Sequence, residues 1–161
     1  MNSHHPNADA LICQYIGSSA PPTPLGWGID GVVYPSPSNF TAIKIHSRVE
    51  SFNRELAAYQ RLAEHGVREF QGFEVPRLVR FDASSLAIEM SIVKAPFLLD
   101  FAAARVDEEP DFPEGLDEWW DRVRANFGDE DFPIAQSVFW GLVNSYGIYY
   151  WDLKPGNLQI R

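Results

Sequence analysis

A change of hydrophobic period over residues 31–65 limits the folds open to this chain more than any other feature. Gly31–Tyr34 and Phe40–Ile45 are rich in β-branched and aromatic residues and flank a turn of Pro, Ser and Asn, which predicts a β-hairpin. From Val49 to His65 the apolar residues recur at helical spacing, and Gly66 follows. We therefore predict an α+β fold that combines antiparallel strands with helices.

Weaker patterns extend this outline along the chain. Three prolines within four residues predict a loop over residues 17–24. Short apolar runs predict further strands at Leu11–Ile16, Val75–Val79 and Leu86–Val93. Helices are expected to begin at Phe97–Ala104 and to cover Ile134–Tyr146, where apolar residues recur at helical spacing up to Gly147.

The charge of the chain lies in one segment. Its 161 residues, of which 45% are hydrophobic, suit a single globular domain. The net charge of −9 disfavours binding to nucleic acid or to an anionic membrane surface. Residues 107–131 hold eleven acidic and two basic residues and so carry the whole net charge, which predicts a solvated acidic insertion.

The single cysteine, Cys13, excludes an internal disulfide and a cysteine-based metal cluster. No apolar run approaches the roughly 20 residues of a membrane span, and residues 1–9 do not have the pattern of a secretion signal. The sequence thus predicts a cytoplasmic protein without a membrane segment.

A glycine motif precedes the hairpin. Gly26, Gly28 and Gly31, with Val33, match the pattern G-x-G-x-x-G-x-V, whose glycines allow backbone amides to approach phosphate oxygens. A dinucleotide-binding fold would require a helix at the last glycine, but a strand follows here. A glycine-rich hairpin turn without any ligand is the alternative interpretation.

Lys44 and Glu55 are the next candidate pair. Lys44 lies within an otherwise apolar strand, and a buried lysine requires a partner. Glu55 precedes Leu56 on the apolar face of the following helix and could be that partner. The alternative is that Lys44 points to solvent and that Glu55 is an ordinary surface acid.

The segment Asp152-Leu153-Lys154-Pro155-Gly156-Asn157 is the most specific motif. It places a carboxylate, an ammonium group and a carboxamide on one short loop between a helix and a strand. These groups can orient a hydroxyl, neutralise a transferring phosphoryl group and bind Mg²⁺. The alternative is a Pro-Gly turn with polar neighbours.

Taken in order, the glycine loop, the strand lysine, the helix glutamate and this last loop resemble the protein kinase fold. The resemblance runs from Gly26 to the end of the chain. It implies a polar, Pro-rich N-terminal segment (1–24), an antiparallel-sheet N-lobe with one αC-type helix (25–94) and an incomplete helical C-lobe (95–161). ATP and Mg²⁺ would be the cofactors.

The resemblance also implies roles for single residues. Gly26, Gly28 and Gly31 would cover the ATP phosphates, while Lys44 would contact the α and β phosphates and pair with Glu55. Val33 and Ala42 would pack on adenine. The hinge that bonds the edge of adenine would include Glu89 and Ser91.

At the other side of the nucleotide, Asp152 would be the catalytic aspartate and Lys154 would assist at the γ phosphate. Asn157 would bind one Mg²⁺. Lys154, two residues after the aspartate, resembles Ser/Thr protein kinases, which transfer the γ phosphate to a protein hydroxyl. The run Arg54–Tyr59 also resembles aminoglycoside phosphotransferases, so the phosphate acceptor stays open.

The sequence departs from the kinase pattern in three ways, the first of which is the acidic segment 107–131 between the hinge and the helix before the last loop. Tyr150 and Trp151 replace the usual His-Arg before the aspartate, so control by a phosphorylated activation loop is not expected. The sequence ends at Arg161 with no Asp-Phe-Gly metal ligand after Asn157. We therefore expect weak or no phosphoryl transfer by this chain alone, as for a kinase-like domain truncated after the catalytic loop.

Three functional hypotheses follow. The first is a kinase-like ATP-binding domain, the second a non-catalytic pseudokinase-type regulatory module, and the third a fragment of a small-molecule phosphotransferase. The apolar face of residues 134–146 would pack in kinases on helices absent from this sequence, which predicts that a protein partner or a second copy covers it.

Overall fold

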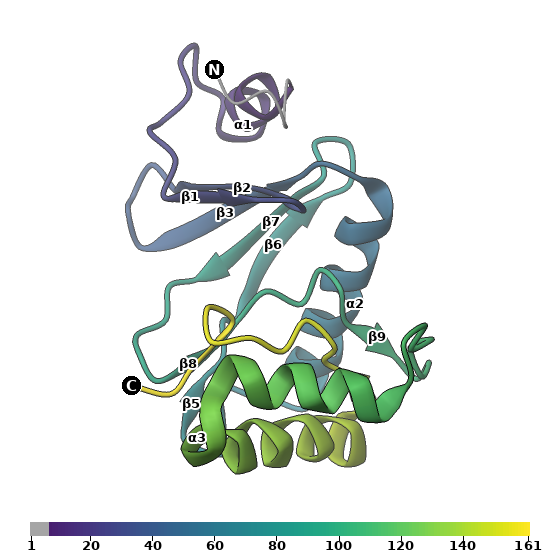
Figure 1. Ribbon diagram of the computed structural model, residues 1–161. Helices are drawn as coiled ribbons and strands as arrows, with labels where there is room; N and C mark the ends of the chain where they lie inside the picture. The colour runs from purple at the N-terminus through teal and green to yellow at the C-terminus, as the bar shows by residue number, and fades with distance from the viewer. Residues whose placement is uncertain (1–6) are drawn as a thin grey trace.

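The computed structural model describes residues 7–161, which form three helices and three small sheets whose strands are antiparallel except for the parallel pair β5 and β8 (Figure 1). A five-stranded antiparallel sheet has the order β1-β2-β3-β7-β6. Its strands are β1 (Gly26–Gly28), β2 (Gly31–Pro35), β3 (Thr41–His46), β6 (Leu78–Asp82) and β7 (Ala87–Ser91). The mixed α+β prediction and the hairpin over residues 31–45 are therefore confirmed.

Helix α1 (Ala8–Ile16) covers the outer face of this sheet, at the top of Figure 1. Ile12 of α1 packs with Val32, Tyr34, Ile43 and Ile45 of the sheet in one apolar cluster. The strand predicted at Leu11–Ile16 is wrong, because a run of six residues, apolar except for Gln14, suits a short helix and a short strand equally well until a packing surface selects one of them. Residues 1–6, with His4 and His5, lie outside the described part.

Helix α2 (Val49–Glu64) lies against the other side of the same sheet. It begins at Val49 as the helical spacing predicts, and it ends at Glu64, one residue earlier than predicted and just before Gly66, whose φ is +65°. Its buried residues include Phe52, Tyr59 and Leu62, which pack with Ile88 and Met90 of β7.

Below the sheet, a second four-stranded sheet has the order β11-β8-β5-β4. Its strands are β4 (Glu69–Phe70), β5 (Phe73–Glu74), β8 (Phe97–Leu98) and β11 (Leu158–Gln159). The helix predicted from Phe97 is wrong: Leu98 pairs with Leu158 of β11, and a left-handed residue, Asp100 (φ 64°), soon interrupts the chain. A third, two-stranded sheet joins β9 (Arg105–Val106) to β10 (Ile148–Tyr149).

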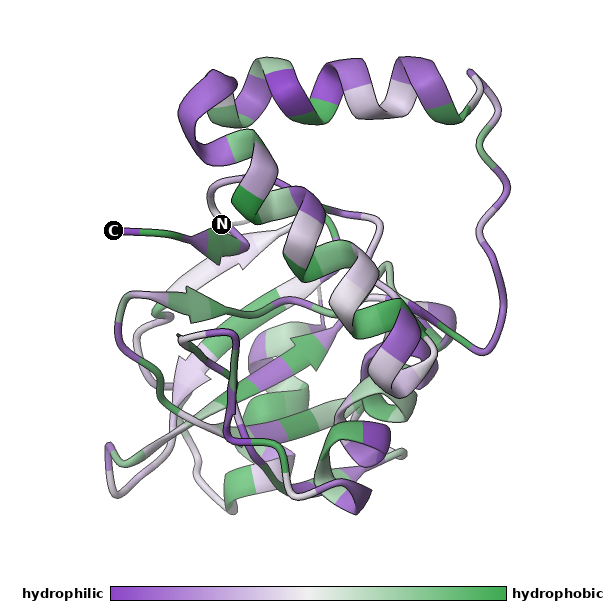
Figure 2. Cartoon of the chain, turned by 90° about the horizontal axis from the view of Figure 1, so that it is seen from below, coloured by the Kyte–Doolittle hydropathy of each residue, from purple (hydrophilic) through white to green (hydrophobic). Residues whose placement is uncertain are grey.

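Helix α3 (Leu116–Tyr146) forms the base of the molecule and contains the predicted helix. Gly128, with φ 77° and ψ 166°, breaks it into two halves, and Figure 2 shows the resulting bend. The first half belongs to the segment interpreted as a solvated insertion. That interpretation is wrong in part, because Trp119 and Val123 are buried in the core while the acidic side chains around them point to solvent.

The bend folds the two halves of α3 against each other. Trp119 and Trp120 contact the ring of Phe139 at centroid distances of 5.1 and 5.2 Å. Val138 and Leu142 are fully buried in the same cluster. The expectation that this helix face lacks a cover inside the chain is therefore wrong at Val138, Phe139 and Leu142, although Ile134 remains 37% exposed.

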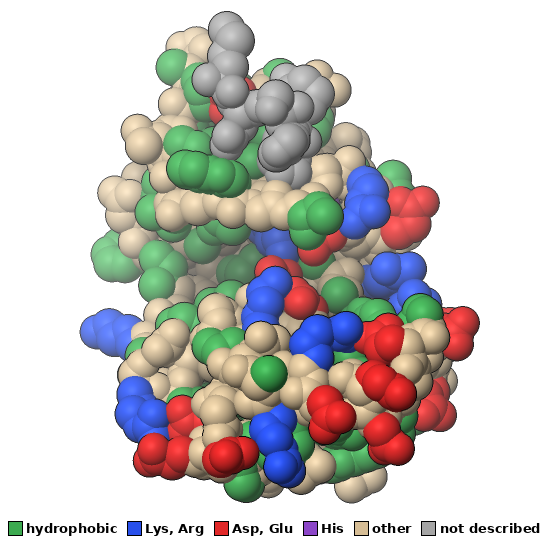
Figure 3. Space-filling model, in the orientation of Figure 1, with side chains coloured by type: hydrophobic (Ala, Val, Ile, Leu, Met, Phe, Trp, Pro, Cys, Tyr) green, Lys and Arg blue, Asp and Glu red, His purple; other side chains and the backbone are tan. Residues whose placement is uncertain are grey.

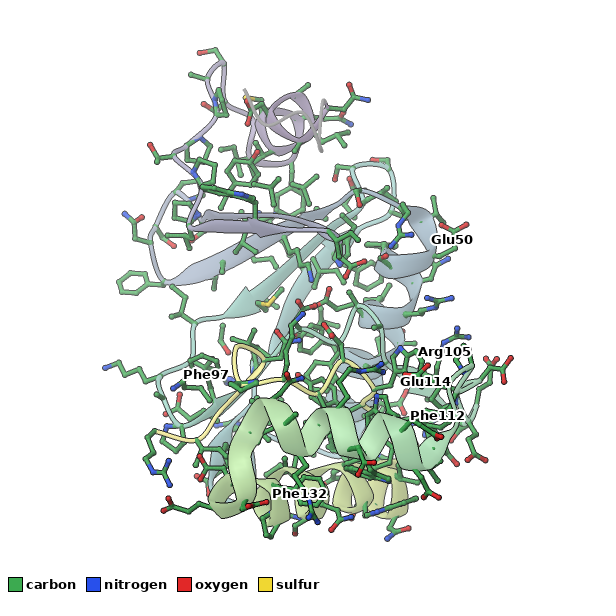
Figure 4. All side chains as sticks on the ribbon, in the orientation of Figure 1. Glu50, Phe97, Arg105, Phe112, Glu114 and Phe132 are labelled. Carbon is green, nitrogen blue, oxygen red and sulfur yellow. The ribbon has the colours of Figure 1, made fainter. Side chains whose placement is uncertain are left out.

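Side chains fill the space between the upper sheet and α3 (Figure 4). The rings of Tyr59, Phe101 and Tyr150 form a continuous contact between α2 and the lower part, at centroid distances of 5.3 and 5.1 Å. Phe112, labelled beside the start of α3, contacts Trp119 and Trp151. One apolar cluster thus runs through both parts of the molecule.

Candidate functional site

A cavity of about 670 Å³, here called the central cavity, lies between the upper sheet and the loops below it. Figure 3 shows the corresponding hollow across the front of the molecule. Its roof is the glycine hairpin from β1 to β2 and the inner face of β3 and β7. Its floor contains Leu99, Asp100, Asp152, Lys154 and Gly156.

Lys44 points into this cavity because side chains alternate along β3. Its neighbours Ile43 and Ile45 face α1, so Lys44 faces the opposite side of the sheet, towards α2. Its Nζ lies 2.8 Å from Glu55 Oε2 and 2.9 Å from Asp100 Oδ1. The lysine side chain is only 8% exposed, so the interpretation that it points to solvent is excluded.

Burial and the neighbouring charges together determine the pKa values of Lys44 and Glu55. Burial would lower the pKa of Lys44, but the carboxylates of Glu55 and Asp100 outweigh burial and raise it. Burial would raise the pKa of Glu55, but the Lys44 ammonium and a hydrogen bond from His46 lower it to about 2. Lys44 and Glu55 are therefore both charged at neutral pH.

His46 completes the environment of Glu55. Its Nε2 lies 2.5 Å from Glu55 Oε2 and its Nδ1 lies 3.1 Å from the carbonyl oxygen of Leu86. The ring is fully buried, and both of its nitrogens face oxygen acceptors. Glu55 is thus fixed between two basic side chains, and this fixes the position of Lys44 in turn.

The glycine hairpin forms the roof, with Gly26, Gly28 and Gly31 all lining the cavity. A Cβ at Gly31 would lie 2.3 Å from the carbonyl oxygen of Ile45, so the close pairing of β2 with β3 requires glycine there. A Cβ at Gly26 or Gly28 would meet nothing within 4 Å. The third glycine is thus explained by the sheet alone, whereas the first two leave open space above the cavity.

The loop after β10 supplies the other polar side of the site. Asp152 Oδ2 accepts a hydrogen bond from Asn157 Nδ2 at 2.9 Å and lies 2.8 Å from Lys154 Nζ. Asn157 also donates to the backbone oxygen of Asp152. Asp152 and Lys154 line the cavity, but Asn157 is 5% exposed and lies behind the aspartate.

The remaining predicted residues divide between the two faces of the sheet. Val33, Ala42 and Ser91 line the central cavity. Glu89 does not, because it pairs in register with Ile43 and so faces α1. Its carboxylate accepts hydrogen bonds from Thr41, Arg80 and Tyr15, which outweigh burial and lower its pKa. The side chain of Glu89 therefore lies outside the cavity, while the expected hinge role, which concerns its backbone, stays a prediction.

Asp100 is the site residue that the sequence interpretation missed. Its left-handed backbone turns the chain after β8, so that its carboxylate lies in the cavity beside Lys44. The signal is the triplet Leu99-Asp100-Phe101 at the end of an apolar run. Order along the chain does not reveal it, because the pairing of β8 with β11 brings this segment beside the loop that holds Asn157.

The central cavity combines charged and apolar groups. A buried ammonium faces the cavity beneath an open glycine hairpin, and two carboxylates, Asp100 and Asp152, lie below. The walls around Val33, Ala42 and Met90 are apolar. Within residues 7–161, no group of three or more His, Cys, Asp and Glu side chains could hold a metal without help from a ligand.

No protein-family model matches the sequence, and no curated protein matches it either. None of the helices in residues 7–161 combines the length and the apolar character needed to cross a membrane. Statements about function therefore depend on the site itself.

Proposed function

We propose that the protein binds ATP with Mg²⁺ in the central cavity and belongs to the protein kinase-like phosphotransferases. The observation that carries this proposal is the buried Lys44–Glu55 pair, which opens into the same cavity as Asp100, Asp152 and Lys154. Buried ion pairs seldom add net stability, so a buried lysine that faces a cavity is better explained by a ligand.

The size and lining of the cavity suit a nucleotide. A volume of about 670 Å³ falls within the usual range for ligand sites. Val33, Ala42 and Met90 offer an apolar slot for the base. Lys44 and the open backbone of the glycine hairpin lie where they can bind phosphate oxygens.

The residues present also fit a magnesium ion. Magnesium in such sites takes one or two carboxylates together with phosphate oxygens, and Asp100 and Asp152 both line the cavity. Asp100 binds Lys44 through Oδ1, and within residues 7–161 no hydrogen bond to its Oδ2 is found. We assign Asp100 as the carboxylate that holds the ion, which would neutralise charge on the phosphates.

Asp152 is positioned to act on the acceptor. Asn157 and Lys154 fix one of its carboxylate oxygens, so the other can accept the proton of an acceptor hydroxyl. The hydroxyl oxygen then attacks the γ phosphorus, and the bond from this phosphorus to the bridging oxygen breaks. ADP leaves, and the proton passes from Asp152 to solvent.

Isothermal titration calorimetry with ATP, with and without Mg²⁺, tests this proposal. We expect saturable binding by the wild-type chain and at least tenfold weaker binding by Lys44→Met. Asp100→Asn should keep binding of ATP alone and lose most of the gain from Mg²⁺. Lys94→Met is the matched control, because Lys94 is exposed and does not line the cavity.

A folded wild-type chain that does not bind ATP would contradict the proposal, and so would a Lys44→Met variant that binds ATP as tightly as the control. In either case the non-catalytic interaction module becomes the leading hypothesis. Far-UV circular dichroism confirms that each variant is folded.

A further inference from the structure

A second cavity of about 380 Å³, here called the side cavity, opens beside the central cavity. Ile29, Asp30, Asp152 and Lys154 line both, so the two cavities meet at the carboxylate proposed to accept the acceptor's proton. The side cavity extends from there between the N-terminal half of α2 and the first half of α3. A molecule bound in it would lie next to the place proposed for the γ phosphate.

The side cavity is lined by cations in a chain that is acidic overall. Four basic side chains, Arg48, Arg54, Arg122 and Lys154, face two acidic ones, Asp30 and Asp152. The whole chain carries −9, so this local excess of positive charge does not follow from composition. In Figure 3, Lys and Arg side chains gather around the right half of the hollow.

Ion pairs within the chain neutralise three of these four cations and leave the fourth, Arg54, without a carboxylate partner among the described residues. Arg48 lies 3.1 Å from Asp30, Lys154 binds Asp152, and Arg122 pairs with Glu114 outside the cavity. Arg54 is half-buried on α2, and within residues 7–161 it makes no hydrogen bond or ion pair. A half-buried guanidinium without a partner, aimed at a cavity, is well suited to bind an anion.

Apolar and amide groups form the rest of the wall. Trp119 is buried, and its ring is nearly parallel to that of Trp151, with an interplanar angle of 11° and a centroid distance of 6.4 Å. Ala102, Ala103 and Val123 complete this side, and Asn126 adds a carboxamide. The cavity therefore suits a small molecule with an anionic group and a less polar body.

We propose that the side cavity binds the phosphate acceptor, and that this acceptor is a small hydroxyl compound carrying a phosphate or carboxylate group. The inference rests on the proposed function, because it assigns the acceptor of that same reaction. Arg54 binds the anionic group and Arg122 adds to the positive field. The acceptor hydroxyl then reaches Asp152 at the junction with the central cavity. A polycationic amino sugar would be repelled.

Titration calorimetry of the 161-residue chain with inorganic phosphate and with citrate tests this inference. We expect saturable binding that weakens as NaCl is raised, because the interaction is ionic. Arg54→Gln should weaken binding of both anions at least tenfold, since it removes a charge-assisted hydrogen bond to the anion. Arg122→Gln should give a smaller loss in the same direction.

Arg124→Gln is the matched control. Arg124 is on the same half of α3, but its guanidinium lies over the ring of Phe132, 4.6 Å from the centroid, and it does not line the side cavity. Its removal should change anion affinity less than twofold. Anion binding that is unchanged in Arg54→Gln, or reduced equally in Arg124→Gln, would overturn the inference.

Two further titrations separate this inference from the proposed function. The Lys44→Met variant should no longer bind ATP but should still bind phosphate and citrate. The Arg54→Gln variant should no longer bind these anions but should still bind ADP. Binding of ATP without any anion binding would overturn the acceptor assignment alone. Anion binding without ATP binding would overturn the proposed function.

Competition between citrate and ADP for one site, or saturable binding of an aminoglycoside, would also count against a separate anionic acceptor.

Discussion

Three charged side chains, Lys44, Glu55 and Asp100, form a charged group at the edge of the core, where the His46 imidazole contacts Glu55. Glu55 is 1% exposed and could not remain ionised there without its two basic neighbours. The removal of Lys44 would therefore leave Glu55 as an uncompensated charge in the protein interior. The contribution of this group to the free energy of unfolding can therefore be measured.

The pKa of Glu55 predicts acid sensitivity. It is about 2 in the folded chain against an ordinary value of 4.5, so the unfolded chain binds this proton more readily. The stabilisation is complete above pH 4.5 and is lost as the pH falls towards 2. Between pH 6 and 3, urea denaturation should show a fall in the free energy of unfolding that is about 2 kcal/mol larger in wild type than in Glu55→Gln.

Glu50→Gln provides the control for this comparison, because Glu50 is exposed near the start of the same helix and points away from the molecule (Figure 4). Its pH dependence should match that of wild type. A Glu55→Gln variant with the wild-type pH dependence would show that the carboxylate is not held ionised as described.

Most of the charged group could be predicted from the sequence, and the failures of the prediction have physical causes. Strand alternation places Lys44 opposite Ile43 and Ile45, and helical spacing places Glu55 beside the apolar stripe. The same alternation, applied to β7, would have placed Glu89 on the outer face. Asp100 could not be found by order along the chain, because a long-range strand pairing puts it in the site.

Helix α1 is tied to the upper sheet by two tyrosine hydroxyls as well as by apolar packing. Tyr15 donates to Glu89 Oε2 at 3.0 Å, and Tyr34 donates to Asp9 Oδ1 at 2.7 Å. Burial and the neighbouring carboxylates raise the pKa of both tyrosines, so the hydroxyls stay protonated as donors. Arg80 lies over the Tyr15 ring, 4.6 Å from its centroid.

Loss of one of these hydroxyls should weaken the attachment of α1 measurably. Tyr15→Phe keeps the ring under Arg80 but removes one donor from the partly buried Glu89 carboxylate. We expect urea denaturation to show a loss of about 1 kcal/mol in the free energy of unfolding. Tyr146→Phe should lose less than half of that, because within residues 7–161 the Tyr146 hydroxyl makes no hydrogen bond. Equal losses would contradict the role given to Tyr15.

The elements that were predicted correctly are those whose hydrophobic period extends over a full hairpin or several helical turns. The hairpin over 31–45 and the helix over 49–64 are examples. The segments predicted wrongly are too short for a helical period to be distinguished from a strand period, as at Leu11–Ile16 and Phe97–Ala104. In the helical part of the acidic segment, the buried residues Trp119 and Val123 are outnumbered by acids, so composition concealed an amphipathic helix.

The upper sheet and the helical base share one core and should unfold together. Residues of α2, β7, β8 and α3 belong to a single buried cluster. Four of the five tryptophans, Trp119, Trp120, Trp140 and Trp151, lie in the lower part, whereas strands and helices occur throughout. Thermal unfolding followed by tryptophan fluorescence and by far-UV circular dichroism should therefore give coincident curves. Midpoints several degrees apart would show that the two parts unfold separately.

The pairing of Leu98 in β8 with Leu158 in β11 has a consequence for synthesis on the ribosome. The glycine hairpin, Lys44, Glu55 and Asp100 all leave the exit tunnel before α3 does, yet the floor of the central cavity forms only when β11 follows. Until then Leu98 lacks its neighbouring strand β11, and Phe101 lacks its contact with the ring of Tyr150. A nascent chain arrested within α3 would carry most of the charged side chains and still lack the floor of the central cavity.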